Sequence, residues 1–148
     1  MLDKTDVQII SALRENCRGS YRELAHRLSL HPTTLISRLK KLEKSGAILG
    51  YSANVDLSKL GYDFFGLVQI KIAKGKLLET QCAISRLGGV VAVYDITGEY
   101  DSAALVAAKS RDSFSKLIKK LLLLPHVEHT NTQVILNIVK DSWQFEPV

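Results

Sequence analysis

Short hydroxyl side chains and cations gather between residues 33 and 44, at a spacing that suits one helix. The hydroxyls come first and the cations follow: Thr33, Thr34, Ser37, Arg38, Lys40, Lys41 and Lys44. Hydroxyl groups near the start of a helix bind phosphates and base edges together with the free backbone N–H groups there. Arginine contacts guanine through two hydrogen bonds, and lysine neutralises phosphate. We therefore expect this helix to bind nucleic acid, with Arg38 contacting guanine and the three lysines contacting phosphate.

The residues around this segment indicate whether its charged side chains bind a partner or only lie in solvent on an ordinary helix. Ser20 and Glu23 form the S-x-x-E pattern that caps the start of a helix. Pro32 suits the first position of the following helix, and Gly46 suits its end. Two short helices joined by a tight turn are typical of a helix-turn-helix, whose second helix lies in the DNA major groove. Residues 20–46 thus predict binding to double-stranded DNA. The start of the first helix is assigned to the same interface: Ser20, Tyr21 and Arg22.

The net charge of +5 is unevenly distributed along the 148 residues. Residues 1–52 hold nine Lys or Arg and five Asp or Glu, whereas residues 53–148 hold eleven and ten. Because phosphate contacts supply much of the affinity of a DNA-binding protein, a basic excess beside the predicted helix-turn-helix supports this interpretation. A modest basic excess is also common on solvated surfaces, so charge alone is weak evidence.

The rest of the chain predicts a second domain that alternates strands and helices. Runs of β-branched and aromatic residues predict strands at residues 62–73, 90–96, 102–108 and 127–140. Apolar residues at helical spacing predict helices at residues 76–87 and 111–124. The order βαββαβ is the ferredoxin-like split arrangement. We therefore expect an α+β chain with a DNA-binding domain at residues 1–50, an extended linker at 51–61 and a ferredoxin-like domain at 62–148.

Both faces of the predicted sheet are rich in apolar residues. In the first strand Val68 and Ile70 point to one face, while Phe65 and Leu67 point to the other. Two helices cover only one face of a four-stranded sheet, and an exposed apolar face is prone to aggregate. A second copy packed sheet against sheet, in a twofold dimer, would cover it. The alternative is that the N-terminal domain covers this face.

Composition disfavours other classes of protein. No window holds about 18 consecutive apolar residues, as a membrane-spanning helix needs, and the charged N-terminus is unlike a signal peptide. We expect a cytoplasmic protein without a membrane partner. Cys17 and Cys82 have no CxxC partner and are interpreted as reduced core residues. The four histidines lack the spacing of a metal site, so we expect no metal.

The helix-turn-helix and the predicted second domain together resemble the Lrp/AsnC family, the leucine-responsive or feast/famine regulators. The resemblance covers nearly the whole chain. Before the linker it rests on Leu2-Asp3-x-x-Asp6, Tyr21-Arg22-Glu23-Leu24-Ala25, Leu28-Ser29-Leu30, Ser37-Arg38-Leu39-Lys40-Lys41-Leu42-Glu43 and Ser45-Gly46-Ala47-Ile48. From the linker onward it rests on Leu60-Gly61-Tyr62, Val93-Tyr94-x-x-Thr97-Gly98-Glu99-Tyr100-Asp101 and Val127-x-x-Thr130-x-Thr132. Each motif alone is common, but the set is specific.

The resemblance implies a winged helix-turn-helix domain joined by an extended linker to an ACT-like, ferredoxin-like domain that binds an effector. It implies a sequence-specific transcription regulator that forms homodimers through the second domain and assembles further, commonly into an octamer. An amino acid or related metabolite is the implied effector, with no other cofactor. In this family the ligand lies between dimers, near the loop that matches residues 98–101 and the strand that matches residues 130–132. Ser37 stands where the family often has arginine or histidine, so no base preference is carried over.

The chemistry of these residues suits an amino-acid ligand. Gly98 allows the backbone to approach a ligand closely, and Asp101 can pair with an α-ammonium group. Neighbouring polar groups can bind a carboxylate or a polar side chain: Glu99, Tyr100, Thr130, Thr132 and Gln133. Without the family resemblance, a tight hairpin turn and two ordinary strand threonines would be the simpler interpretation.

Two other functions remain open at this level. One is an architectural DNA-binding protein that has no effector. The other is an enzyme, since some haem-biosynthesis decarboxylases resemble this family in fold. The sequence offers no clear set of catalytic residues, so we expect a regulator and not an enzyme.

Overall fold

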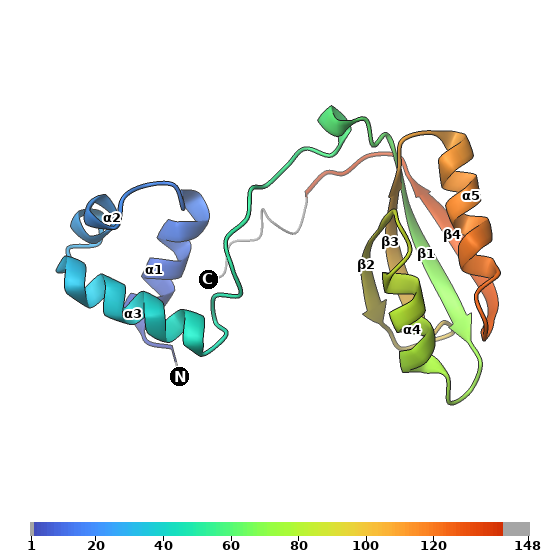
Figure 1. Ribbon diagram of the computed structural model, residues 1–148, viewed down its shortest axis with the longest axis horizontal. Coiled ribbons are helices and arrows are strands. Elements are labelled where there is room, and N and C mark those ends of the chain that lie inside the picture. The colour runs from blue at the N-terminus through green and yellow to red at the C-terminus, as the bar shows by residue number, and fades with distance from the viewer. Residues whose placement is uncertain (1, 141–148) are drawn as a thin grey trace. The chain divides into compact units, whose positions relative to one another are not determined.

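The computed structural model describes residues 2–140, which form two compact units (Figure 1). Among the described residues, the first unit covers 2–54 and the second spans Val55–Lys140. The boundary lies within the segment for which the sequence predicts a linker.

Three helices make up the first unit: α1 (Lys4–Glu15), α2 (Tyr21–Arg27) and α3 (Pro32–Lys44). The predicted cap at Ser20 is confirmed, because Ser20 accepts a hydrogen bond from the backbone N–H three residues on, and Asp3 caps α1 in the same way. Pro32 stands at the start of α3, where its missing N–H costs nothing. One side of each helix packs into a shared core: Ile9, Ala12, Leu13, Leu24, Ala25, Leu35, Leu39 and Leu42.

The segment after α3 is extended but forms no strand among the described residues 45–57. Gly46 adopts a left-handed conformation with φ 75° and ends the helix as predicted. The wing implied by the family resemblance is therefore not formed as strands here, because this unit offers no second strand to pair with. A short 3₁₀ helix, Ser58–Leu60, lies within the segment predicted as an extended linker and ends at Gly61.

The turn between α2 and α3 holds a serine in an unfavourable conformation. Ser29 has φ 54°, a left-handed value that costs a non-glycine residue about 1 kcal/mol or more. We expect Ser29→Gly to raise the free energy of unfolding by about 0.5 kcal/mol, after the added flexibility of the unfolded chain is subtracted. Urea unfolding measures it. Ser45→Gly, at φ −78°, is the control and should lower stability; a loss in both variants would contradict the expectation.

The second unit has the predicted order βαββαβ. Its strands are β1 (Phe64–Ile72), β2 (Val90–Asp95), β3 (Ser102–Ala108) and β4 (Val127–Ile135), and its helices are α4 (Leu77–Ser85) and α5 (Arg111–Leu122). The strands form one antiparallel sheet in the order β2-β3-β1-β4. The fold class predicted from the sequence is thus confirmed.

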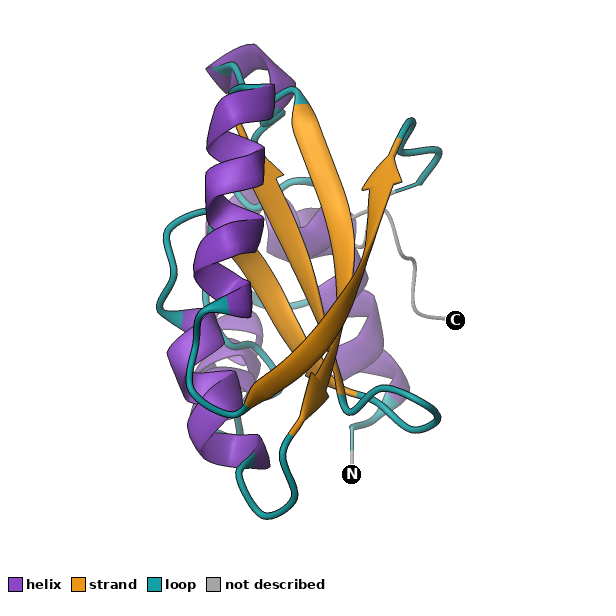
Figure 2. Ribbon diagram, turned by 90° about the vertical axis from the view of Figure 1, so that its right-hand side faces the viewer, coloured by secondary structure: helices purple, strands orange, loops and turns teal. Residues whose placement is uncertain are grey.

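Both helices of this unit pack against the same face of the sheet. Figure 2 shows α5, the long helix nearest the viewer, running along one side of the twisted strands. Ile84 of α4 and Leu117 of α5 bury Val68 and Ile70 of β1. Gly66 lies on this face because a Cβ there would stand 2.7 Å from the Phe114 ring. The opposite face carries side chains that these helices do not cover, as predicted: Phe65, Leu67, Gln69 and Lys71 of β1, with Leu105 of β3 and Tyr94 of β2 beside them.

Two predictions about this chain are wrong in detail. The last strand ends at Ile135 rather than at residue 140, because its partner β1 begins at Phe64 and offers nothing further to pair with. Cys17 and Cys82 are free thiols, but both are exposed rather than in the core. Cys82 lies on α4, whereas Cys17 follows the end of α1.

Candidate nucleic-acid interface and effector site

The outer face of α3 carries the hydroxyls and cations singled out by the sequence. Leu35, Leu39 and Leu42 are buried on its inner face. The side chains on the other side of the helix follow the spacing i, i+4, i+7, i+8 and i+11 and are all exposed: Thr33, Ser37, Lys40, Lys41 and Lys44. Thr34, at the edge of this face, is exposed as well. An isolated exposed stripe of three lysines and two hydroxyls on a helix-turn-helix is suited to phosphate contact.

The residues at the start of the two helices have local partners of their own. Ser20 Oγ accepts the Glu23 N–H at 3.1 Å, so its hydroxyl works as a helix cap. Tyr21 and Arg22 are exposed on the first turn of α2. Thr33 Oγ1 lies 2.8 Å from His31 Nδ1. The other nitrogen of the His31 ring adds a hydrogen-bond donor or acceptor beside the start of α3. The sequence interpretation had no role for His31.

Arg38 does not lie on the outer face of α3. Its Nη1 atom donates hydrogen bonds to Asp3 Oδ2 at 2.6 Å and to Asp6 Oδ1 at 2.7 Å. The hydrogen bond from Arg38 lowers the pKa of the Asp3 carboxyl. The guanidinium is paired with two carboxylates at the surface, with 32% of the side chain exposed, and only Nη1 makes these bonds, so the guanine contact stays a prediction beside a positioning role. The side chain ties α3 to the start of α1.

A signal for this role was present in the sequence. Arg38 follows Leu35 by three residues and precedes Leu42 by four, so it borders the buried side of the helix rather than the outer one. Asp6 is only 15% exposed in its side chain, which is low for an aspartate. A charged residue on the edge of the core needs a partner, and the two carboxylates at the start of α1 provide it.

The loop between β2 and β3 lies against β1 and the start of β4. Gly98 adopts φ 117°, which only glycine takes without strain. Lys71 of β1 donates hydrogen bonds to the Glu99 carbonyl at 2.9 Å and to Asp101 Oδ1 at 3.2 Å. The Tyr100 ring meets the His129 ring edge to face, with centroids 5.6 Å apart. The structure thus brings residues 98–101 together with β4, as the resemblance implies, and adds Lys71.

Asp101 has hydrogen-bond partners within the protein. Its Oδ2 accepts the backbone N–H of Ile72 at 2.8 Å, and its Oδ1 accepts Lys71. The hydrogen bond from Ile72 and then the Lys71 ammonium lower the pKa of this carboxyl. Each oxygen accepts one hydrogen bond and has capacity for a second, and the side chain is 30% exposed, so the ion pair between Asp101 and an α-ammonium group stays a prediction. Asp101 fixes the loop to β1.

The candidate residues of β4 divide between the two faces of the sheet. Residues that pair directly across antiparallel strands share a face. Thr130 pairs with Ile70 and Thr132 with Val68, so the two threonines share the helix-covered face. Gln133 pairs with Leu67 and belongs to the open face. A ligand bound at this edge of the sheet would therefore contact Gln133 only from the face that the helices leave uncovered.

The bound state of Asp101 gives its loop a pH-dependent stability. A lowered pKa means that the charged carboxylate stabilises the folded state above its ordinary pKa of 3.8, and that this contribution is lost as the pH falls through the folded value. We expect Asp101→Asn to lower the melting temperature at neutral pH, with the difference from the parent chain shrinking as the pH falls below 3.8 and through the lowered pKa of the folded state. Melting curves across this range test it, with exposed Asp63→Asn as control. A difference that does not change with pH would contradict this role.

Within residues 2–140, no three His, Cys, Asp or Glu side chains come together as metal ligands would. No helix in the same part of the chain is long and apolar enough to cross a membrane.

A helix-turn-helix unit with a basic outer face, followed by a βαββαβ unit, defines the class of two-domain helix-turn-helix transcription regulators. Residues 2–43 match the AsnC-type helix-turn-helix domain, and residues 66–145 match the Lrp/AsnC ligand binding domain. The chain belongs to the Lrp/AsnC family. This family and the chain's relatives are regulators of transcription rather than enzymes.

Relatives and solved structures support the assignment over nearly the whole chain. An uncharacterized HTH-type transcriptional regulator of Pyrococcus abyssi is 38% identical, over 99% of this chain and 100% of that protein. The structure of AsnC from E. coli superposes with a TM-score of 0.91 at 27% identity, covering 99% of each chain. A transcriptional regulator from Neisseria meningitidis, solved in complex with L-Met, superposes with a TM-score of 0.87 at 27% identity, covering 95% of this chain and 94% of that one.

Proposed function

We propose that this regulator binds specific sites in double-stranded DNA through α3 and changes its binding when an amino acid occupies the second unit. The observation that carries the first half is the exposed stripe on α3, opposite a fully buried leucine face. Three of its side chains are lysines, which release counterions from phosphates on binding. We place this activity in the cytoplasm, with the DNA.

The proposed DNA interface assigns a role to each exposed residue. Thr33, Thr34 and Ser37 face base edges and phosphates from the first turns of α3, and Lys40, Lys41 and Lys44 contact phosphates. Tyr21 and Arg22 at the start of α2, beside the capping residue Ser20, contact the backbone of the duplex. Arg38 is a positioning residue in this scheme, because its guanidinium is held by Asp3 and Asp6.

Two copies of α3 are brought together by the second unit. The open sheet face carries Phe65 and Leu67 of β1 in the middle of the sheet, with no helix of its own unit above them. We propose that two such faces pack together in a twofold homodimer, and that dimers assemble further into an octamer. A symmetric dimer presents its two α3 helices to two half-sites on DNA.

The effector site is proposed at the loop of residues 98–101 and the start of β4. The regulator from Neisseria meningitidis was solved with L-Met, which supports an amino acid as the ligand class. Asp101, which also accepts bonds from Ile72 and Lys71, and the exposed carboxylate of Glu99 together are the proposed partners for the α-ammonium group. The remaining polar contacts are supplied by the loop and by β4: Gly98, Tyr100, Thr130, Thr132 and Gln133.

Lys41 provides a direct test of the DNA interface. If Lys41 contacts phosphate, Lys41→Ala will weaken binding to all DNA sequences alike and reduce the slope of log affinity against log salt by about one. Fluorescence anisotropy on specific and random duplexes at several salt concentrations measures both quantities. Lys119→Ala, an exposed lysine of α5, is the matched control and should change neither. A loss confined to one DNA sequence would contradict a phosphate contact.

A thermal-shift screen of the full chain against the twenty amino acids tests the effector site. A ligand that binds only the folded state raises the melting temperature. At least one amino acid should raise it and change DNA affinity, and Glu99→Gln should remove both responses. If no amino acid changes either quantity, the chain is an architectural DNA-binding protein without an effector.

A further inference from the structure

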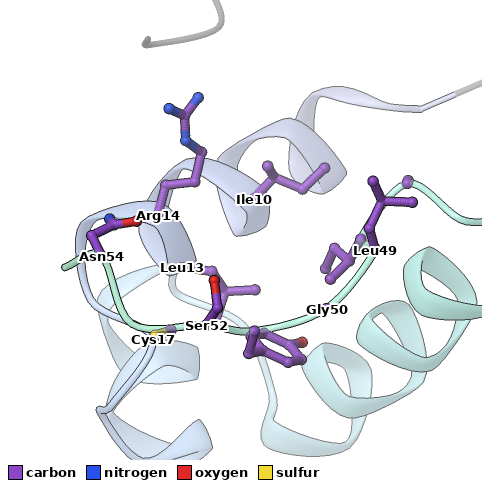
Figure 3. Close-up of a pocket in the computed structure, with 11 residues that line it drawn as sticks. Ile10, Leu13, Arg14, Cys17, Leu49, Gly50, Ser52 and Asn54 are labelled. Carbon is purple, nitrogen blue, oxygen red and sulfur yellow. The ribbon is translucent and has the colours of Figure 1, made fainter. Parts of the chain in front are cut away.

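The two units offer a ligand different kinds of surface. In the first unit, a pocket of about 370 Å³ lies between α1 and the extended segment that follows α3. Figure 3 shows part of its apolar lining, with Ile10 and Leu13 on α1 and Leu49 on the extended segment. In the second unit, the loop before β3 and the strands beside it bring acidic and basic side chains together. A zwitterion, such as the proposed amino-acid effector, is therefore better matched by the second unit.

Lys71 is a cation of this second place that the protein itself does not use completely. Its ammonium group donates hydrogen bonds to the Glu99 carbonyl at 2.9 Å and to Asp101 Oδ1 at 3.2 Å. An ammonium group has three N–H donors. Among residues 2–140, no acceptor meets the third donor, and 32% of the side chain is exposed. Lys71 can therefore hold the loop and still donate one hydrogen bond to a bound anion.

His129 stands beside Lys71. The two residues pair directly across β4 and β1, so their side chains are neighbours on the open face of the sheet. The His129 ring meets the Tyr100 ring edge to face, with centroids 5.6 Å apart. In the described part of the chain, the ring nitrogens of His129 have no hydrogen-bond partner, and the side chain is exposed. The ring is thus held by an aromatic contact while its nitrogens remain available to a ligand.

The charge that His129 gains on protonation would act among other charged groups. Charged side chains neighbour His129 from the loop, from β1 and from β4 itself: Asp101 and Glu99, Lys71, and Glu128. A carboxylate bound at the third Lys71 donor would add a negative charge beside the ring. Such a charge stabilises the protonated form of the ring, and by the same coupling the protonated ring strengthens binding of the carboxylate.

We infer that Lys71 and His129 bind the α-carboxylate of the amino-acid effector, opposite the acidic side chains proposed for its α-ammonium group, and that protonation of His129 tightens this binding. The inference rests on the proposed effector site and adds to it a basic half and a dependence on pH. A histidine side chain changes its charge within about pH 5–8. The affinity for the effector therefore rises as the pH falls through this range, and the regulator reads the amino acid and the pH together.

The affinity at two pH values tests the role of His129. The full chain is screened against the twenty L-amino acids by thermal shift, and the dissociation constant of each binder is measured by calorimetry at about pH 6 and about pH 8. The parent chain should bind about two- to fivefold more tightly at the lower pH, as expected for an exposed ion pair. His129→Gln should bind equally at both. His126→Asn, at another exposed histidine near the start of β4, is the matched control and should keep the pH dependence.

An analogue without a carboxylate tests the basic half of the site. The amino alcohol of the same amino acid keeps the α-ammonium group and the side chain, but it carries a neutral hydroxymethyl group in place of the carboxylate. It should bind at least about tenfold more weakly than the amino acid, because hydrogen bonds to charged groups are the stronger ones. Its affinity should not depend on His129. Lys71→Gln, with folding checked by its melting curve, should reduce the preference for the amino acid over the amino alcohol.

The results distinguish failure of this inference from failure of the effector site. An amino acid that binds equally at both pH values, or whose pH dependence survives in His129→Gln, would overturn the inference and leave the effector site in place. An amino alcohol that binds as tightly as its amino acid would do the same. If none of the twenty amino acids binds at either pH, the effector site itself is wrong, and the inference is wrong with it.

Discussion

Arg38→Ala should weaken binding to every DNA sequence by at least about tenfold and should lower the melting temperature of the DNA-binding unit. The physical reason is the pair of hydrogen bonds that join its Nη1 atom to Asp3 at 2.6 Å and to Asp6 at 2.7 Å. These bonds fix α3 to the start of α1. Without the guanidinium, two neighbouring carboxylates repel each other and lose their partner. Since α3 then has no fixed orientation, its lysines and hydroxyls no longer reach the duplex together.

Matched variants distinguish a positioning role of Arg38 from direct contact between Arg38 and a base. Asp6→Asn should reproduce much of the loss, and Arg38→Lys should recover part of it, because a lysine keeps the charge but not the two-pronged geometry. Lys41→Ala should leave the melting temperature unchanged. Binding to specific and random duplexes, with melting curves for each variant, provides the measurement. If Arg38→Ala keeps its stability but loses discrimination between the two duplexes, Arg38 contacts a base, as its sequence position first indicated.

Leu67→Asp should convert the homodimer to monomers. Leu67 lies near the centre of the open sheet face, on a central strand between β3 and β4. In a dimer packed sheet against sheet, the twofold axis would bring two such aspartates close together in an apolar layer, where neither charge is solvated. We expect the dimer dissociation constant to rise by about 100-fold or more. Analytical ultracentrifugation across a concentration series measures it.

The control for this variant lies on the other side of the second unit. Leu123 is 83% exposed after α5, so Leu123→Asp should leave the dimer intact even if it affects larger assemblies. Melting curves for both variants show whether the unit still folds. A folded Leu67→Asp chain that remains a dimer would exclude the open sheet face as the dimer interface.

Local sequence signals were sufficient to predict most of the helices and strands of the fold. Asp3, Ser20 and Ser110 cap their helices by bonds to residues three positions on, and such bonds need no information from the rest of the chain. The alternation in β1 predicted one buried and one open face for the same reason. The end of β4 was missed because it depends on where β1 begins, and this is set by pairing between segments 70 residues apart.

The candidate sites were predicted less completely. The residue types of α3 indicated its outer face, but they did not show that Arg38 turns toward Asp3 and Asp6, more than 30 residues away. The same holds for Asp101, whose partners Ile72 and Lys71 lie on another strand. Lys71 interrupts an otherwise mostly apolar strand, and that irregularity was the available signal. Partners that become neighbours only through tertiary packing leave little trace in one sequence.

Hydroxyl-radical footprinting of the full chain on DNA selected from a random pool tests the central claim most directly, namely that paired α3 helices contact DNA. We predict two related protected half-sites, separated centre to centre by about one helical turn of 10–10.5 base pairs or a multiple of it. Folded Leu67→Asp protein should lose this paired pattern. A single unpaired half-site, or the same paired footprint from a monomeric Leu67→Asp chain, would contradict the claim.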